Sequence, residues 1–141
     1  MARVPNPLTA LRHVPLFSSC SAKDLARIAK ACERVTFPAG RVLIEQGQPG
    51  REAFIVVKGT AVVRRSGRKI AHVGPGAMIG ELALLDHGPR TATVVCETEC
   101  DVLVLSQRHF HGVLDDVPAL SHKLLATLAA RIREFDRSSY G

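Results

Sequence analysis

One stretch of the chain decides the fold: residues 79–94 read IGELALLDHGPRTATV and lie between two strand-like apolar runs. Gly80 permits an unusual backbone dihedral angle or a close approach of another group. The good helix formers from Glu81 to Leu85 are long enough for about one helical turn. Such a turn presents free N–H groups and a partial positive charge, which suit an anion such as phosphate.

Two charged residues of this stretch complete the pattern. We expect Arg90 to return to the same place and to supply a charge-assisted hydrogen bond to a phosphate. Glu81 would repel that phosphate, but its carboxylate suits a neutral hydroxyl group as an acceptor. An arginine for a phosphate and a carboxylate for a ribose hydroxyl together indicate a nucleotide. The competing interpretation is an ordinary surface ion pair between Glu81 and Arg90, worth about 0–1 kcal/mol.

The sequence around this stretch, residues 40–106, has the texture of a β-structure. Short runs rich in Val, Ile, Thr and Phe alternate with turns that contain Gly and Pro. Many short strands at such spacing indicate an antiparallel sandwich or a small barrel of the jelly-roll kind. The expected strands are the runs at residues 42–44, 54–57, 60–63, 70–73, 91–96 and 101–105.

A helix is predicted before this region, over residues 21–33. Ser21 followed by Asp24 is typical of a capping box, in which the serine oxygen accepts a hydrogen bond from an unpaired helical N–H. Apolar residues then recur at three- and four-residue spacing, at Leu25, Ile28, Ala29 and Cys32.

Residues 108–136 return to a helical pattern. We expect a short helix over 108–114, a capping carboxylate from Asp115-Asp116, and a longer helix with Pro118 in its first turn. This longer helix carries a heptad-like seam, widened by Leu120 and Leu124, at Leu125, Leu128, Ile132 and Phe135. Two interpretations stay open for the seam: packing on the chain's own sandwich, or a dimer contact with a second copy.

Composition indicates a globular protein with one domain over residues 1–141. Hydrophobic residues make up 46% and charged residues 23% of the 141, which excludes a disordered chain. No apolar run approaches the ~20 residues that span a bilayer, and the first residues do not form a secretory signal. We therefore expect a cytoplasmic protein with no membrane insertion.

Charge and cysteine usage add two weaker indications. The formal net charge of +6 is concentrated in the first half of the chain, and a basic half attracts anionic partners such as nucleic acid. Its densest cluster, around the turn Ser66-Gly67, is better explained as a solvated hairpin tip; it comprises Arg64, Arg65, Arg68 and Lys69. The four cysteines lack the spacing of a metal site, so small buried thiols are the favoured interpretation.

With these residues in view, the sequence resembles the cyclic nucleotide-binding domains. The phosphate-binding cassette of that family reads apolar-Gly-Glu-x-small-apolar, then Arg-(Ser/Thr/Ala)-Ala-x-apolar, which residues 79–84 and 90–94 match. Further similar elements lie at residues 15–17, 37–40, 43–50 and 54–59, so the resemblance covers roughly residues 14–137.

The resemblance implies a mainly β fold: a β jelly roll, or double-stranded β-helix, with an N-terminal helix and C-terminal helices around it. It implies that Glu81 accepts the ribose 2′-hydroxyl and that Arg90 pairs with the cyclic phosphate. It places the base against the terminal helix, at some of Leu120, Leu124, Leu125 and Leu128. The implied ligand-binding residues are Ile79, Gly80, Glu81, Leu82, Ala83, Arg90, Thr91 and Ala92.

The resemblance further implies a regulatory or sensor module rather than an enzyme. cAMP is the favoured ligand, and Thr91, a hydroxyl residue that contacts guanine in some members, permits cGMP as the alternative. Too few residues follow the long helix for a recognition helix. Unless the chain is a fragment of a longer protein, we therefore expect no sequence-specific DNA binding and an output through a protein partner or a homodimer.

Two alternatives stay open. The first is a jelly-roll interaction or dimerisation protein that has lost its ligand. The second, less favoured, is a cupin-type metalloenzyme, which needs two or three His with a carboxylate converging inside the barrel. The pair His109 and His111 does not supply this, because residues two apart on a helix point in different directions. No catalytic residue and no metal ligand are predicted.

Overall fold

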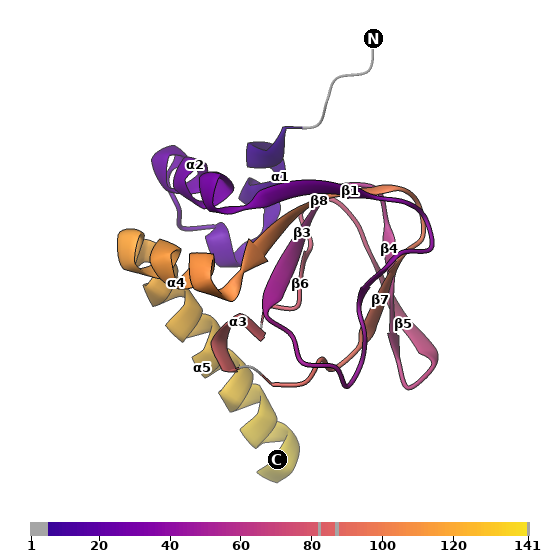
Figure 1. Cartoon of the computed structure of the whole chain (residues 1–141). Helices are drawn as coiled ribbons and strands as arrows, with labels where there is room; N and C mark the ends of the chain where they lie inside the picture. Colours follow the sequence, from indigo (N-terminus) through magenta and orange to yellow (C-terminus); the bar gives the residue numbers. More distant parts are fainter. Residues whose placement is uncertain (1–5, 82, 87, 141) are drawn as a thin grey trace.

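The computed structural model, which describes residues 6–81, 83–86 and 88–140, contains two four-stranded antiparallel sheets with helices packed at one side (Figure 1). The first sheet has the order β1-β8-β3-β6, with strands Glu33–Phe37, Cys100–Ser106, Glu52–Lys58 and Met78–Ile79. The second has the order β2-β7-β4-β5, with strands Val42–Ile44, Thr93–Cys96, Ala61–Arg65 and Arg68–Val73. The predicted jelly roll with flanking helices is confirmed.

Each of the six predicted runs contains a strand, and the sequence patterns missed two others. Strand β1 follows α2 (Ala22–Ala31) almost directly, and its first residue, Glu33, was assigned to the end of the predicted helix. Strand β6 has only two residues. Helix α1 (Pro7–His13) and the 3-10 turn η1 (Pro15–Phe17) were also missed. Because the helices span more residues than the strands, "mainly β" slightly overstates the fold.

The N-terminal helix begins as predicted and ends earlier than predicted. The Ser21 hydroxyl accepts a hydrogen bond from the Asp24 N–H, and the Asp24 carboxylate accepts one from the Ser21 N–H, which completes the capping box. Cys32 does not lie on the helix: it is the C-cap residue, with extended backbone angles. The chain enters β1 immediately afterwards, at Glu33.

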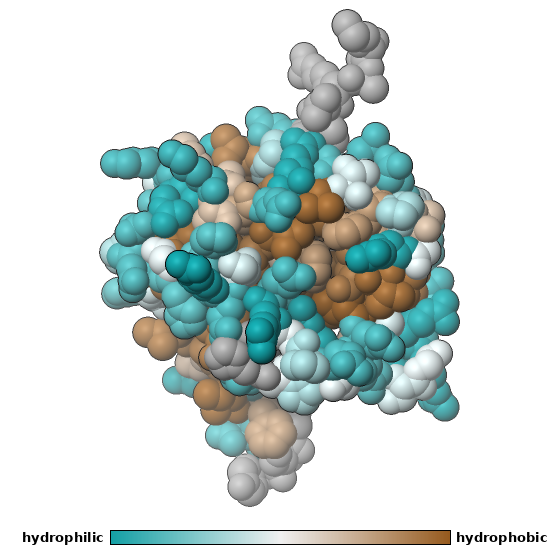
Figure 2. Space-filling view, in the orientation of Figure 1, coloured by the Kyte–Doolittle hydropathy of each residue, from teal (hydrophilic) through white to brown (hydrophobic). Residues whose placement is uncertain are grey.

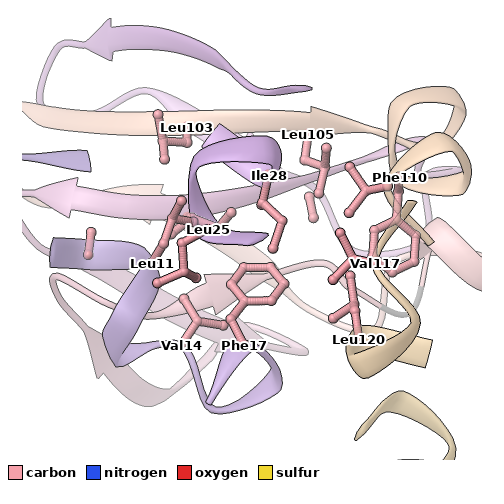
Figure 3. Close-up of a cluster of buried hydrophobic side chains, with 14 of the residues drawn as sticks. Leu11, Val14, Phe17, Leu25, Ile28, Leu103, Leu105, Phe110, Val117 and Leu120 are labelled. Atoms are coloured by element: carbon pink, nitrogen blue, oxygen red, sulfur yellow. The ribbon is translucent and has the colours of Figure 1, made fainter. Parts of the chain in front are cut away.

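Two apolar clusters lie on opposite faces of the first sheet. Strand β3 is buried at five consecutive positions because both of its faces are covered. On one face, the N-terminal helices pack Phe17, Leu25 and Ile28 against Leu103 and Leu105 of β8 (Figure 3). On the other face, the second cluster fills the space between the sheets; it comprises Ile44, Phe54, Val56, Ala61, Ile79, Val94, Cys96, Cys100 and Val102.

The C-terminal region consists of α4 (Gln107–Asp116) and α5 (Pro118–Tyr140). The predicted capping role of Asp115-Asp116 is wrong, because both residues lie inside the last turn of α4. Asp116 instead accepts a hydrogen bond from Arg27 Nε at 2.8 Å and so ties α4 to α2. No helix of the described residues has the length and apolar character needed to cross a bilayer.

Helix α5 packs on the domain at its beginning and leaves its later apolar residues uncovered. Leu120 is fully buried, and Leu124 packs against the same cluster. Leu125, Ile132 and Phe135 are 63–70% exposed. Figure 1 shows the helix running past the sheets, and Figure 2 shows apolar surface in the same region. Packing on the chain's own sandwich therefore accounts for the start of the helix and not for its seam.

The basic cluster sits at a tight hairpin between β4 and β5, as predicted. Ser66 and Gly67 have φ values of 53° and 80°, which suits the two-residue turns that join twisted antiparallel strands. Its four basic side chains are exposed. Cys96 and Cys100 are buried, and Cys20 and Cys32 are half-buried. Burial raises the pKa of the Cys32 thiol to about 12.

Candidate functional site

A cavity of about 610 Å³ opens on the residues that the sequence analysis singled out. Of the eight predicted ligand-binding residues, six line it: Ile79, Gly80, Glu81, Arg90, Thr91 and Ala92. Ala83 is the first residue of α3 (Ala83–Asp86), and Leu82 lies outside the described residues. The predicted stretch thus forms one wall of a single cavity. Apolar side chains from both sheets add to the lining, at Ile44, Val63, Val73, Met78 and Val94.

Arg90 is held deep in this wall by backbone carbonyl groups. Its Nη2 donates to the carbonyl of Glu52 at 2.7 Å, and its Nη1 donates to the carbonyl of Gly80 at 3.3 Å. Only 9% of the residue is exposed. Burial lowers the pKa of Arg90, while the nearby Glu52 carboxylate acts in the opposite direction. Within the described part of the chain, no carboxylate lies at ion-pair distance from Arg90.

The loop between β2 and β3 fixes the backbone of Arg90. The Arg90 N–H donates to the carbonyl of Gln48 at 2.8 Å, and the Gly47 N–H donates to the carbonyl of Arg90 at 2.9 Å. Pro49 and Pro89 form an isolated antiparallel bridge beside them. The turn-forming residues 47–50 therefore position the arginine that the cassette supplies.

Two glycines leave room for the guanidinium. A Cβ atom on Gly50 would lie 2.4 Å from Arg90 Cζ, and one on Gly80 would lie 2.4 Å from Arg90 Nη1. Gly80 also has a φ of 79°, a conformation that side-chain-bearing residues rarely adopt. From the sequence, Gly50 belongs only to the family-like element at residues 43–50, because its contact with Arg90 spans 40 positions of sequence.

Glu81 and Arg90 do not pair with each other, so the interpretation as a surface ion pair between them is wrong. Glu81 accepts a hydrogen bond from Arg131 Nη2 of α5 at 3.2 Å. The Glu81 side chain is 31% exposed. The carboxylate is therefore available at the cavity and is linked to the C-terminal helix.

Helix α5 reaches the cavity through a residue that the sequence analysis missed. None of Leu120, Leu124, Leu125 and Leu128 is among the residues that line the cavity, so their contact with a bound base stays a prediction. Leu120 is instead buried in the cluster beneath the helices. Arg131 lines the cavity. The register of the helix relative to the sheets cannot be read from the sequence, which therefore holds no signal for this residue.

The β4–β5 hairpin contributes a third arginine to the cavity. Arg65 lines it, and Arg65 Nε donates to the carbonyl of Thr91 at 3.1 Å. The described lining contains three arginines, Arg65, Arg90 and Arg131, and two carboxylates, Glu81 and Asp86, which leaves one net positive charge. Such a cavity suits a ligand with an apolar body and a single negative charge.

A metal centre of the cupin type needs several His, Cys, Asp or Glu side chains grouped together. Within residues 6–81, 83–86 and 88–140, no three His, Cys, Asp or Glu side chains are grouped to hold a metal ion. His109 lies at the start of α4, where its Nδ1 is 2.9 Å from the Ser106 hydroxyl.

Comparison with known proteins places these features in a family. The family model "cyclic nucleotide-binding domain" matches residues 34–116. The chain is 30% identical over 127 residues to the Cyclic AMP receptor protein of Thermus thermophilus. This match covers 86% of this chain and 59% of that protein. The chain is 32% identical over 129 residues to a cAMP-dependent protein kinase regulatory subunit of Pyricularia oryzae, which covers 89% and 33% respectively.

A solved structure agrees with these relatives. The N-terminal domain of a transcriptional regulator from Streptomyces coelicolor A3(2) superposes with a TM-score of 0.79 at 34% identity, over 91% of this chain and 95% of that one. The chain spans less than two thirds of the length of the two curated relatives named above. It belongs to the cyclic nucleotide-binding domain family.

Proposed function

We propose that this chain is a regulatory sensor module that binds a cyclic mononucleotide, with cAMP as its ligand and cGMP as the alternative. The observation that carries the proposal is the buried Arg90 guanidinium at the cavity wall, which is bonded to backbone carbonyls and unmatched by a carboxylate in the described residues. A buried charge is costly unless it is paired, and a cyclic phosphate supplies the missing counter-charge.

The rest of the cavity fits the other parts of such a ligand. Glu81 would accept a hydrogen bond from the ribose 2′-hydroxyl through the carboxylate oxygen that Arg131 does not use. The apolar side chains of the two sheets would cover the sugar and base. The single net positive charge of the described lining matches the single negative charge of a cyclic monophosphate.

The choice of cAMP as first ligand is supported by relatives. The names of the Thermus thermophilus receptor and the Pyricularia oryzae kinase subunit both refer to cAMP. Thr91 lines the cavity and keeps cGMP as the alternative.

We propose that ligand binding acts through α5. Arg131 joins that helix to the carboxylate that would receive the ribose, so a ligand that engages Glu81 changes the balance between arrangements of α5. The exposed seam at Leu125, Ile132 and Phe135 would then meet a second copy of the chain or a protein partner. A cytoplasmic location stays a prediction.

Isothermal titration calorimetry tests the proposed ligand. The chain should give a saturable heat with cAMP or cGMP, while 5′-AMP, which has an open phosphate with a second charge, should bind more weakly. Absence of both heat and thermal stabilisation with millimolar cyclic nucleotide would defeat the proposal.

The second candidate, an interaction protein without a ligand, is favoured by the seam alone. Three large apolar residues of α5 are exposed in this chain, which is typical of a surface that another molecule covers. Light scattering with and without cAMP separates the two candidates. A dimer whose mass and stability are indifferent to nucleotide supports this second function.

A further inference from the structure

We propose that Arg65 gives the site its affinity for guanine: its guanidinium recognises the paired acceptors O6 and N7 of that base, so that the site accepts cGMP besides cAMP because of this residue. This inference rests on the proposed function and deepens it. The observation behind it is a third arginine that lines the cavity from the β4–β5 hairpin and is anchored to Thr91.

The hairpin holds Arg65 at the cavity although its tip is exposed. Arg65 Nε donates to the carbonyl of Thr91, the residue directly after Arg90. The Ser66 N–H donates to Gln46 Oε1 at 2.7 Å, and the Gln46 N–H donates to Thr93 Oγ1 at 2.9 Å. These contacts tie the tip to the strand and loop that form the cavity wall, so the guanidinium has a defined place there.

The same contacts leave the outer edge of the guanidinium available. Among the described residues, no acceptor is bonded to Arg65 Nη1 or Nη2. The two carboxylates of the cavity are engaged elsewhere: Glu81 pairs with Arg131, and Asp86 accepts from the Gly88 N–H. Arg65 thus presents a planar fork of N–H donors, which can bind two neighbouring acceptors at once.

A purine nucleotide offers such a pair at one place besides its phosphate. Guanine carries the acceptors O6 and N7 side by side, whereas adenine carries an amino donor at position 6 beside N7. A fork of donors therefore discriminates between the bases, while Arg90 treats their identical cyclic phosphates alike. Of the arginines at the hairpin tip, Arg65 lines the cavity. Arg68, on the other strand of the hairpin, is not among the lining residues.

The test is a set of calorimetric titrations of the whole chain with cGMP, cIMP and cAMP. cIMP keeps O6 and N7 and lacks the 2-amino group, so it separates the acceptor edge of guanine from that amino group. Arg65→Ala should weaken cGMP and cIMP by about tenfold each. It should change cAMP by less than about twofold, as expected for the loss of one exposed charge. Arg68→Ala, which removes the same charge from the same hairpin, should leave all three affinities unchanged.

The outcomes are distinguishable. An equal loss for all three nucleotides in Arg65→Ala would mean that the residue acts through charge or structure, and it would overturn the inference. Unchanged affinities would overturn it as well. If the unmodified chain binds none of the three, the proposed function itself fails. If the chain binds them and only the dependence on Arg65 is missing, the proposed function stands without this inference.

Discussion

At the scale of single residues, the site is built around one buried cation and the space left for it. Arg90 receives its backbone position from the β2–β3 loop and its side-chain partners from the carbonyls of Glu52 and Gly80. None of these partners is a neighbour in sequence. The cassette pattern indicated which arginine matters, and the loop at residues 47–50 explains why it can stay buried.

Gly50→Ala should weaken cAMP binding by about tenfold, because the new Cβ would lie 2.4 Å from Arg90 Cζ and displace the guanidinium. Gly74→Ala is the matched control, since a Cβ there meets no atom closer than 4.0 Å. Neither glycine has a positive φ, so the free energy of unfolding of Gly74→Ala should change by less than about 1 kcal/mol. In Gly50→Ala the displaced guanidinium also loses its two carbonyl partners, which should lower the free energy of unfolding by about 1–3 kcal/mol. Calorimetry and urea denaturation check the two quantities. Equal cAMP affinity in the two variants would argue against the role given to Gly50.

At the scale of elements, local signals predicted the fold better than they predicted the site. The capping box at Ser21 and Asp24 involves residues three apart, and the turn at Ser66-Gly67 lies between adjacent strands. Both were readable from the sequence. Strand β1 was missed because its pattern continues that of α2 without a Gly or Pro between them.

The contributions of distant elements to the cavity could not be read in this way. Arg65 and Arg131 come from a hairpin and a terminal helix, and only the packed structure brings them to the residues 79–94. The leucines of α5 were expected to contact the base, because the packing of the helix cannot be read from the sequence. Their spacing fixed a helical face, but the packing of that face against η1 and the cluster beneath it decided that Leu120 is core.

The link between α5 and the cassette yields a prediction for motion. Arg131→Ala removes the ion pair with Glu81 and should speed hydrogen exchange of the amides in residues 125–137. Its effect on the free energy of unfolding should stay within about 1 kcal/mol, because both side chains are partly exposed. Arg133→Ala, an exposed arginine of the same helix that is not among the cavity-lining residues, is the control. Identical exchange in the two variants would show that the pair does not hold the helix.

At the scale of the whole molecule, the apolar face of α5 formed by Leu125, Ile132 and Phe135 is exposed. Phe135→Ser should leave the stability of a monomer nearly unchanged, because the side chain is 70% exposed. If the seam joins two copies, the same change should shift light scattering from the mass of two chains to that of one. A dimer that persists in Phe135→Ser would place the contact elsewhere.

The buried thiols predict how stability depends on pH. Burial raises the pKa of the Cys32 thiol from 9.0 to about 12, and burial also raises that of Cys96 to about 12. The folded state therefore favours the neutral thiols. Their contribution is fully present below pH 9 and is lost as the pH rises toward 12, since the unfolded chain releases its protons first. Urea denaturation from pH 7 to 11 should give a shallower decline for Cys32→Ala than for the unmodified chain, and parallel curves would contradict this account.

The central claim is that Arg90 is the counter-charge of a cyclic phosphate. The most direct test is to measure the affinities of the unmodified chain and of Arg90→Ala for cAMP and for adenosine. Adenosine keeps the base and the ribose and lacks the phosphate. The unmodified chain should prefer cAMP over adenosine by roughly 10- to 100-fold, and Arg90→Ala should abolish most of that preference. A variant that folds and prefers cAMP as strongly as the unmodified chain would contradict the claim.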